Sequence, residues 1–130
     1  MTLFSKIIAG EIPSYKIAED DYFFAFLDIA PLVRGHVLVI PKVEVDKVFD
    51  LDDTYLSRLL VFAKPIAKAL EKTMDCKRCA LSVVGLEVPH AHLHLLPINV
   101  MDDTNFTRTK MKFSDKEMAE IQQTIINALN

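Results

Sequence analysis

Three of the four histidines occupy alternate positions in the stretch His90-Ala91-His92-Leu93-His94. Successive side chains of an extended strand point to opposite faces, so this spacing places three imidazoles on one face and apolar residues on the other. The flanking residues Pro89 and Pro97 favour a short strand over a helix. The stretch is therefore interpreted as a strand with one imidazole face and one apolar face that packs on a core.

Three interpretations fit such a face. Imidazoles can bind zinc, but three ligands on one strand lie almost in a line, whereas a tetrahedral site needs converging ligands. A neutral imidazole can instead attack a phosphorus atom while its neighbours donate protons or hydrogen bonds. The third interpretation is purely structural, and it is disfavoured because crowded imidazoles need polar partners. Chemistry on a phosphate is the favoured interpretation.

The composition restricts the classes of partner. The chain has 130 residues, 51% of them hydrophobic and 25% charged, which predicts a single domain over residues 1–130. A net charge of −3 argues against a nucleic-acid partner, which needs a basic surface. No apolar run approaches the roughly 18 residues that span a bilayer, so no membrane partner is expected. The first residues lack the features of a signal peptide, and a cytoplasmic location is predicted.

The elements that position the histidines follow from periodicity. Strands are expected at 15–18, 22–27, 36–41 and 78–84, in addition to the histidine strand. Helices are expected at 3–9, at 50–73, and after a capping box at Ser114-Asp115-Lys116-Glu117. Strands on both sides of one long helix, joined by hairpin-like connections, predict an α+β fold with a mainly antiparallel sheet.

The long helix carries two specific expectations. Asp52 or Asp53 should cap its start, and the interior residue Pro65 predicts a kink or break because proline removes one helix hydrogen bond. Apolar residues at helical spacing should form its buried face. That face comprises Leu56, Leu59, Leu60, Ala63, Ala67 and Leu70.

The two cysteines form a single Cys-x-x-Cys pair, Cys76 and Cys79, between this helix and the next strand. A zinc half-site is one interpretation, but there is no second such pair. A thioredoxin-like motif would open a helix, whereas this pair follows one. Two reduced structural cysteines are the favoured interpretation.

The stretch His90–Leu96 resembles the HφHφHφφ signature of the histidine triad (HIT) superfamily. Segments 3–14, 19–21, 25–31 and 35–42 resemble the preceding segments of that family in the same order, so the resemblance covers roughly residues 2–97 and is closest to the Hint-like branch. It implies a HIT-like fold: about five antiparallel strands, one long helix and a C-terminal helix. It also implies a homodimer formed through the long helix and a sheet edge.

The resemblance implies a nucleotide-binding hydrolase that cleaves at the α-phosphate of purine nucleotides of the phosphoramidate or adenylate type and releases AMP. By analogy His92 is the nucleophile and forms a nucleotidyl-histidine. His94 would contact the phosphate and help to protonate the leaving group. His90 would orient His92 through its backbone carbonyl, and His36 would hydrogen-bond within the triad. The resemblance implies no metal and no other cofactor.

The resemblance also supplies a nucleotide-binding set. Asp28 would bind the ribose hydroxyls, since a carboxylate can accept two hydrogen bonds. Ordinary core packing for Phe4 and Ile7, and a turn role for Asp28, are the structural alternatives. The apolar wall around the base would comprise Phe4, Ile7, Ile12, Phe26 and Ile29, because a base stacks on apolar side chains.

The chain departs from the family pattern at two places. Glu44 follows the Ile-Pro-Lys stretch where many Hint-like members carry a histidine, and Glu87 lies in a short loop where the family often has a hydroxyl residue that contacts the phosphate. A carboxylate there would repel a phosphate. Three alternatives therefore stay open: a dinucleoside polyphosphate (Ap3A or Ap4A) hydrolase, a nucleotide-binding regulatory protein with little turnover, and a zinc protein.

Overall fold

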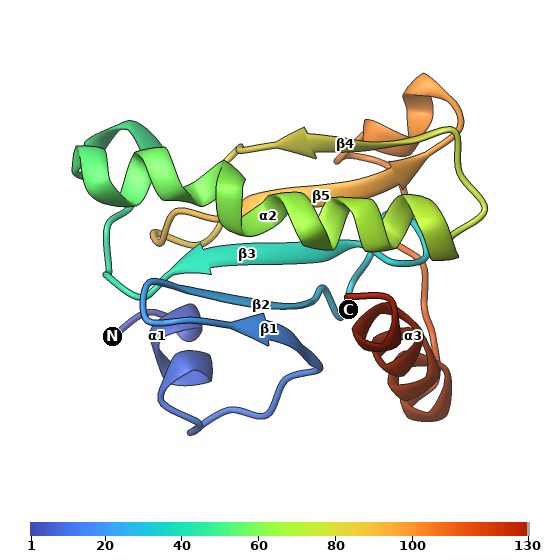
Figure 1. Ribbon diagram of the computed structural model, residues 1–130, viewed down its shortest axis with the longest axis horizontal. Helices are drawn as coiled ribbons and strands as arrows, with labels where there is room; N and C mark the ends of the chain where they lie inside the picture. Colours follow the sequence, from blue (N-terminus) through green and yellow to red (C-terminus); the bar gives the residue numbers. More distant parts are fainter. Residues whose placement is uncertain (130) are drawn as a thin grey trace.

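The computed structural model describes residues 1–129 and contains the five-stranded antiparallel sheet that the sequence predicts (Figure 1). The strands follow one another across the sheet in the order β1-β2-β3-β5-β4. Among the described residues, no helix combines the length and the apolar character needed to cross a membrane. The strands are β1 (Lys16–Glu19), β2 (Phe23–Leu27), β3 (Val37–Pro41), β4 (Arg78–Ser82) and β5 (Leu93–Ile98). The helices are α1 (Leu3–Ile8), α2 (Asp53–Thr73) and α3 (Asp115–Asn127), with short 3-10 turns η1 (Val48–Asp50) and η2 (Met101–Thr104).

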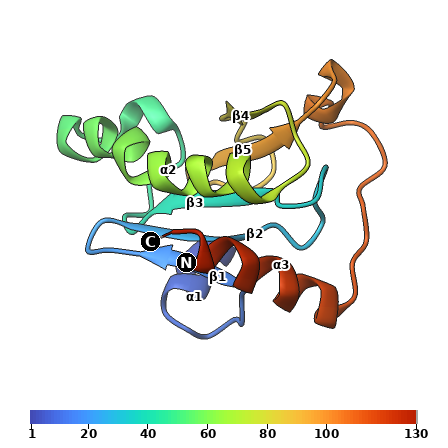
Figure 2. The same cartoon turned by 45° about the vertical axis from the view of Figure 1, so that its right-hand side comes forward.

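Helices α2 and α3 cover one face of the sheet (Figures 1 and 2). The helix caps are those expected: the Asp52 side chain accepts from Tyr55 N–H at the start of α2, and Ser114 and Glu117 form the capping box of α3. The main core lies between these helices and the alternate residues Phe23, Ala25 and Leu27 of β2.

Two expectations for α2 are wrong. Leu60 is 55% exposed and Ala67 is only partly buried, whereas Ile66 and Ala69 face the sheet. The helix also runs without a break through Pro65, so a break is wrong, and a kink there stays a prediction. Pro65 lies on the exposed side, where water can satisfy the carbonyl that the missing N–H leaves free.

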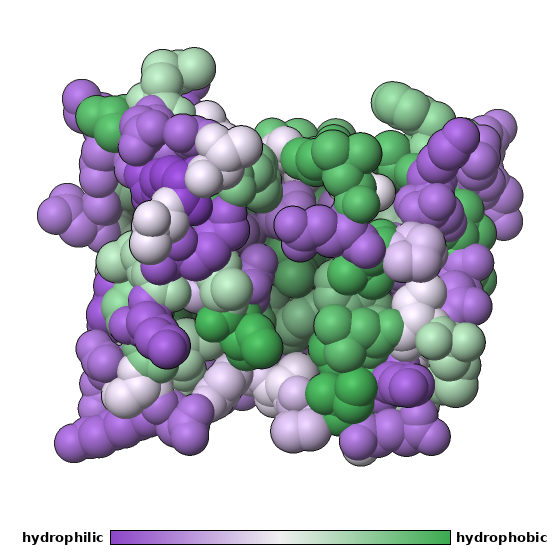
Figure 3. Space-filling model, turned by 180° about the vertical axis from the view of Figure 1, so that it is seen from behind, coloured by the Kyte–Doolittle hydropathy of each residue, from purple (hydrophilic) through white to green (hydrophobic). Residues whose placement is uncertain are grey.

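The opposite face of the sheet carries α1. Phe4 and Ile7 of this helix pack on Phe24 and Phe26 of β2 and on residues of the adjacent strand β3. Together these side chains form a second and smaller core. Seen from this side, hydrophobic residues surround a hollow near the centre of the molecule (Figure 3). Helices α2 and α3 do not cover this hollow, because they lie on the other face.

The histidine strand is shorter than expected. Strand β5 begins at Leu93, so of the three triad histidines only His94 lies within it. Pro41 ends β3 and has no N–H to donate to the histidine stretch. The N–H of Ala91 bonds to the carbonyl oxygen of Val45, in the loop after β3, at 2.7 Å rather than to Pro41. The apolar side of the stretch is buried as predicted, with Ala91, Leu93 and Leu95 at most 2% exposed.

Candidate active site

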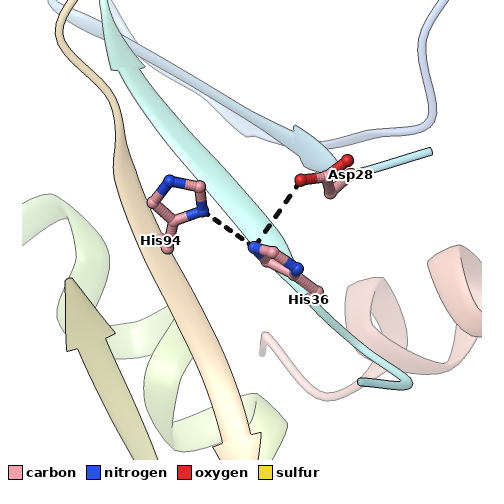
Figure 4. Close-up of side chains that lie close together, drawn as sticks. All are labelled: Asp28, His36 and His94. Atoms are coloured by element: carbon pink, nitrogen blue, oxygen red, sulfur yellow. Dashed lines mark hydrogen bonds and ion pairs between the residues drawn. The ribbon is translucent and has the colours of Figure 1, made fainter. Parts of the chain in front are cut away.

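The sheet register places His94 beside the second core. Leu38 is paired with Phe26 on one side and with His94 on the other, so the three side chains form a cross-strand row on the face opposite α2. His36 precedes β3 directly, and its carbonyl oxygen accepts from Asp28 N–H at 3.0 Å. Three strands thus bring Asp28, His36 and His94 together (Figure 4).

A chain of hydrogen bonds fixes the proton on His94. The N–H of Leu32 donates to His36 Nδ1 at 3.1 Å, so the neutral His36 ring carries its proton on Nε2. His36 Nε2 lies 2.9 Å from His94 Nδ1, which must therefore accept (Figure 4). His94 consequently has its N–H on Nε2.

A second chain gives His92 the opposite arrangement. His92 Nδ1 lies 2.7 Å from the carbonyl oxygen of His90, and a carbonyl can only accept, so Nδ1 carries the proton. In the neutral form of this ring, the Nε2 atom of His92 has a free lone pair. His90 Nε2 donates in turn to the carbonyl oxygen of Pro41 at 2.8 Å.

Burial favours the neutral form of His36, His90 and His94. It lowers the pKa of His36 to about 3 and that of His94 to about 4, with the nearby charges of Lys110 and the neighbouring histidines acting in the same direction. Burial also lowers the pKa of His90. Acceptance at His36 Nδ1 and at His94 Nδ1 requires neutral rings, so the arrangement of these two histidines persists at pH 7.

An apolar cavity of about 230 Å³ brings the predicted nucleotide-binding set together. Its floor includes Leu38, and His92, His94 and Glu87 lie at one end. Phe4 and Ile7 are at once core residues and cavity residues, so their core packing is confirmed and their place in the wall around a base stays a prediction. The lining contains all six residues of the set, namely Phe4, Ile7, Ile12, Phe26, Asp28 and Ile29.

A second cavity of about 290 Å³ lies on the other side of the histidines. Residues 84–87 form one wall, and Phe106, Thr107 and Lys110 form another. Asp28, Glu87, His92 and His94 line both cavities. A ligand that occupied both would therefore pass across the two imidazoles. His90 lines neither cavity, so the expected face of three equivalent imidazoles is reduced to two.

Asp28 offers one oxygen to a ligand. Its Oδ1 accepts from Ala30 N–H at 2.9 Å, whereas Oδ2 lies 3.7 Å from His36 Nε2, whose proton is already donated to His94. Burial raises the pKa of Asp28. Ligand atoms of Asp28, His36 and His94 lie within 4.8 Å of one another and could in principle hold a metal ion. The His36–His94 hydrogen bond engages two of these three atoms.

Sequence reasoning did not identify Phe106 or Thr2. The ring of Phe106 lies edge-on to His94 with centroids 4.7 Å apart, and Thr2 Oγ1 lies 2.8 Å from His90 Nδ1. A lone aromatic residue in the polar segment 99–112, and a threonine at an N-cap position, were the available signals. Of the cationic side chains in that segment, Arg108 pairs with Asp102 and Asp103, whereas Lys110 lines the second cavity.

Comparison with known proteins identifies close relatives. The HIT domain family profile matches residues 9–101. An uncharacterized HIT-like protein of Borreliella burgdorferi is 36% identical over 95% of this chain and 94% of its own length. An adenosine 5'-monophosphoramidase of Saccharomyces cerevisiae is 42% identical over 73% of this chain and 61% of its own length. The crystal structure of a Hit-like protein involved in cell-cycle regulation from Bartonella henselae superposes with a TM-score of 0.83, at 29% identity over 98% of this chain and 95% of that one.

Proposed function

This chain belongs to the HIT family, and we propose that it is a hydrolase that cleaves purine nucleotides at the α-phosphorus, with adenosine phosphoramidates or adenylates as substrates. The observation that carries the proposal is the opposite protonation of two neighbouring imidazoles. His92 presents a lone pair on Nε2, and His94 presents an N–H on Nε2. A nucleophile and a hydrogen-bond donor are what displacement at phosphorus requires. The phosphoramidase of yeast is a relative whose name describes such an activity.

In the proposed first step, His92 Nε2 attacks the α-phosphorus and forms a P–N bond. The bond from phosphorus to the leaving amine then breaks. The departing amine takes up one proton, which comes from solvent through the second cavity and is guided by His94 Nε2–H. Water then attacks the nucleotidyl-histidine and releases AMP and one proton. The proton count of the enzyme is unchanged over the cycle, and no metal ion takes part.

The apolar cavity is the proposed site of the base. It is lined by Phe26 and Leu38 from the sheet and by Phe4 and Ile7 from α1, surfaces on which a purine can stack. Asp28 Oδ2, at the boundary between the two cavities, is the proposed acceptor for the ribose hydroxyls. The nucleoside thus extends from the apolar cavity to the histidines.

The test is AMP release from adenosine phosphoramidate, a lysyl-adenylate, Ap3A and Ap4A by the wild-type protein and by His92→Ala. We expect turnover of the first two by wild type, and loss of that turnover in the variant. Equal AMP release by both proteins would overturn the mechanism. Preferential cleavage of Ap3A or Ap4A would assign the chain to the dinucleoside polyphosphate hydrolases. Tight AMP binding with no turnover of any substrate would indicate a regulatory nucleotide-binding protein.

We further propose that the protein acts as a homodimer. Strand β4 lies at the sheet edge, where its Leu81 is 58% exposed, and Leu60 and Val61 of α2 are 55% and 71% exposed. An open edge strand and apolar helix residues are features that a symmetric dimer covers. Light scattering should give twice the 14.7 kDa chain mass, and Leu81→Arg should lower it, whereas Val100→Arg, at an exposed residue beyond β5, should not.

The two free thiols, Cys76 and Cys79, support a cytoplasmic location.

A further inference from the structure

Thr2, Ser5, Glu44 and the His90 ring form a connected hydrogen-bond cluster at the start of α1, and we call it the N-terminal cluster. Thr2 Oγ1 lies 2.8 Å from His90 Nδ1 and accepts from Ser5 N–H at 3.0 Å. Ser5 Oγ donates to Glu44 Oε1 at 2.8 Å. The proposed mechanism uses His90 only through its backbone carbonyl, so the side chains of the cluster have no part in it yet.

The direction of each proton in the cluster can be assigned. His90 Nε2 donates to the carbonyl oxygen of Pro41, and burial keeps the ring neutral, so His90 Nδ1 must accept. The available donor is the hydroxyl of Thr2, whose contact with His90 at 2.8 Å is shorter than its 3.2 Å contact with Ser5 Oγ. Because His90 is 0% exposed, water cannot replace this hydroxyl without a rearrangement.

Glu44 anchors the other side of the cluster. Its carboxylate accepts from Thr2 N–H as well as from Ser5 Oγ, and these two hydrogen bonds lower the pKa of Glu44. The loop that carries Glu44 is itself fixed to the histidine stretch, because Val45 O accepts from Ala91 N–H at 2.7 Å. Glu44 therefore ties the start of α1 to the segment that holds the nucleophile.

The cluster adjoins residues of the base cavity and the nucleophile. Phe4, two residues after Thr2, lines the base cavity and meets the His92 ring edge-on with centroids 4.9 Å apart. The carbonyl of His90 holds His92 Nδ1, and the ring of the same residue is held by Thr2. A shift of His90 would thus move the hydrogen bond that orients His92.

We propose that Thr2 is a positioning residue: its hydroxyl, supported by Ser5 and Glu44, holds the His90 ring so that the His90 carbonyl keeps His92 Nε2 aimed at the substrate phosphorus. The proposal rests on the proposed function for its kinetic consequence, but its geometric content concerns the tautomers of His90 and His92 alone. It also gives a use to Glu44, which is where the chain departs from the family pattern.

The kinetic test compares Thr2→Val, which is nearly isosteric but cannot donate, with Thr2→Ser, which restores the hydroxyl. Thr2→Val should lower kcat for AMP release about tenfold, as small displacements of a reacting group do. Thr2→Ser should regain most of the wild-type kcat. Thr124→Val, on the exposed face of α3, is the matched control and should leave kcat unchanged. A Thr2→Val protein with wild-type kcat, or with only a raised KM, would overturn the proposal.

A second measurement separates this proposal from the proposed function. The ¹⁵N shifts of the imidazole nitrogens in the wild-type protein should show the proton on Nε2 of His90 and on Nδ1 of His92, and this requires no turnover. Absence of AMP release with these tautomers present would reject the hydrolase assignment and retain the geometric part. A His90 ring protonated on Nδ1 would reject the role of Thr2 even in an active enzyme.

Discussion

His92 and His94 stand two residues apart, yet two different regions of the molecule hold them. His92 depends on a carbonyl of its own segment and, beyond it, on the start of α1. His94 depends on His36, which the loop preceding β3 fixes through Leu32 N–H. The support of His92 is a carbonyl acceptor, so His92 carries its proton on Nδ1. The support of His94 is an N–H donor, so His94 carries its proton on Nε2. Position within a hydrogen-bond chain, rather than residue type, therefore determines which ring nitrogen carries the proton.

The largest effects on AMP release are expected when each imidazole is removed in turn. His92→Ala should lower AMP release by at least about 10³-fold, because no other nitrogen replaces the nucleophile. His94→Ala should lower it by roughly 10²-fold, as loss of a group that guides a proton to the leaving amine does.

The leaving group distinguishes these two losses. With the p-nitrophenyl ester of AMP, whose leaving group needs no proton, the activity of His94→Ala should approach that of wild type, and His92→Ala should stay inactive. Equal rescue of both variants by this substrate would show that the two histidines do not have separate roles. Steady-state AMP release on the two substrates is the measurement.

The sequence was sufficient for the parts of the site that depend on periodicity. Alternation in the histidine stretch and the apolar run of β3 predicted the sheet, and the six nucleotide-binding residues that the family resemblance named all line the apolar cavity. The burial of His90 away from the cavities was not predictable from alternation, because it depends on Pro41 and Val45, which stop the ladder before His90. The contact of Phe106 with His94 was equally hidden, since it joins an irregular segment to a strand.

The next test breaks the chain that supports His94. His36→Phe leaves the Leu32 N–H and His94 Nδ1 without partners, so the His94 proton is no longer confined to Nε2. AMP release should fall about tenfold. The free energy of unfolding should fall by about 1–3 kcal/mol, the cost of leaving a buried polar group unpaired. Urea titration and AMP assays on His36→Phe and His36→Gln measure both, and an active, stable His36→Phe would contradict the relay.

Acid should weaken the fold through the same chain. The folded pKa values of His36 and His94, about 3 and about 4, lie below the ordinary histidine value near 6.5. Between the folded and unfolded pKa values, the unfolded chain therefore binds more protons than the folded protein. The free energy of unfolding keeps its full value above about pH 6.5 and falls as the pH is lowered. Each histidine contributes up to about 1.4 kcal/mol per pH unit. Urea unfolding from pH 7.5 to 4.5 should show this decline, and it should be shallower in His36→Gln.

The smallest effect is expected at Glu87, which lines both cavities and makes no hydrogen bond or ion pair to another described residue. Burial is the main cause of the raised pKa of Asp28 and the charge of Glu87 adds to it, so Glu87 acts on the site without belonging to either chain. Glu87→Gln should leave kcat for a phosphoramidate with an uncharged leaving amine unchanged, because the supports of His92 and His94 are intact. It should raise kcat/KM for Ap4A about fivefold, because a polyphosphate leaving group no longer meets a carboxylate; removal of one exposed charge is worth about 1 kcal/mol. Glu120→Gln on α3 makes the same change in net charge away from the site, and a similar gain in that variant would show that Glu87 has no local effect.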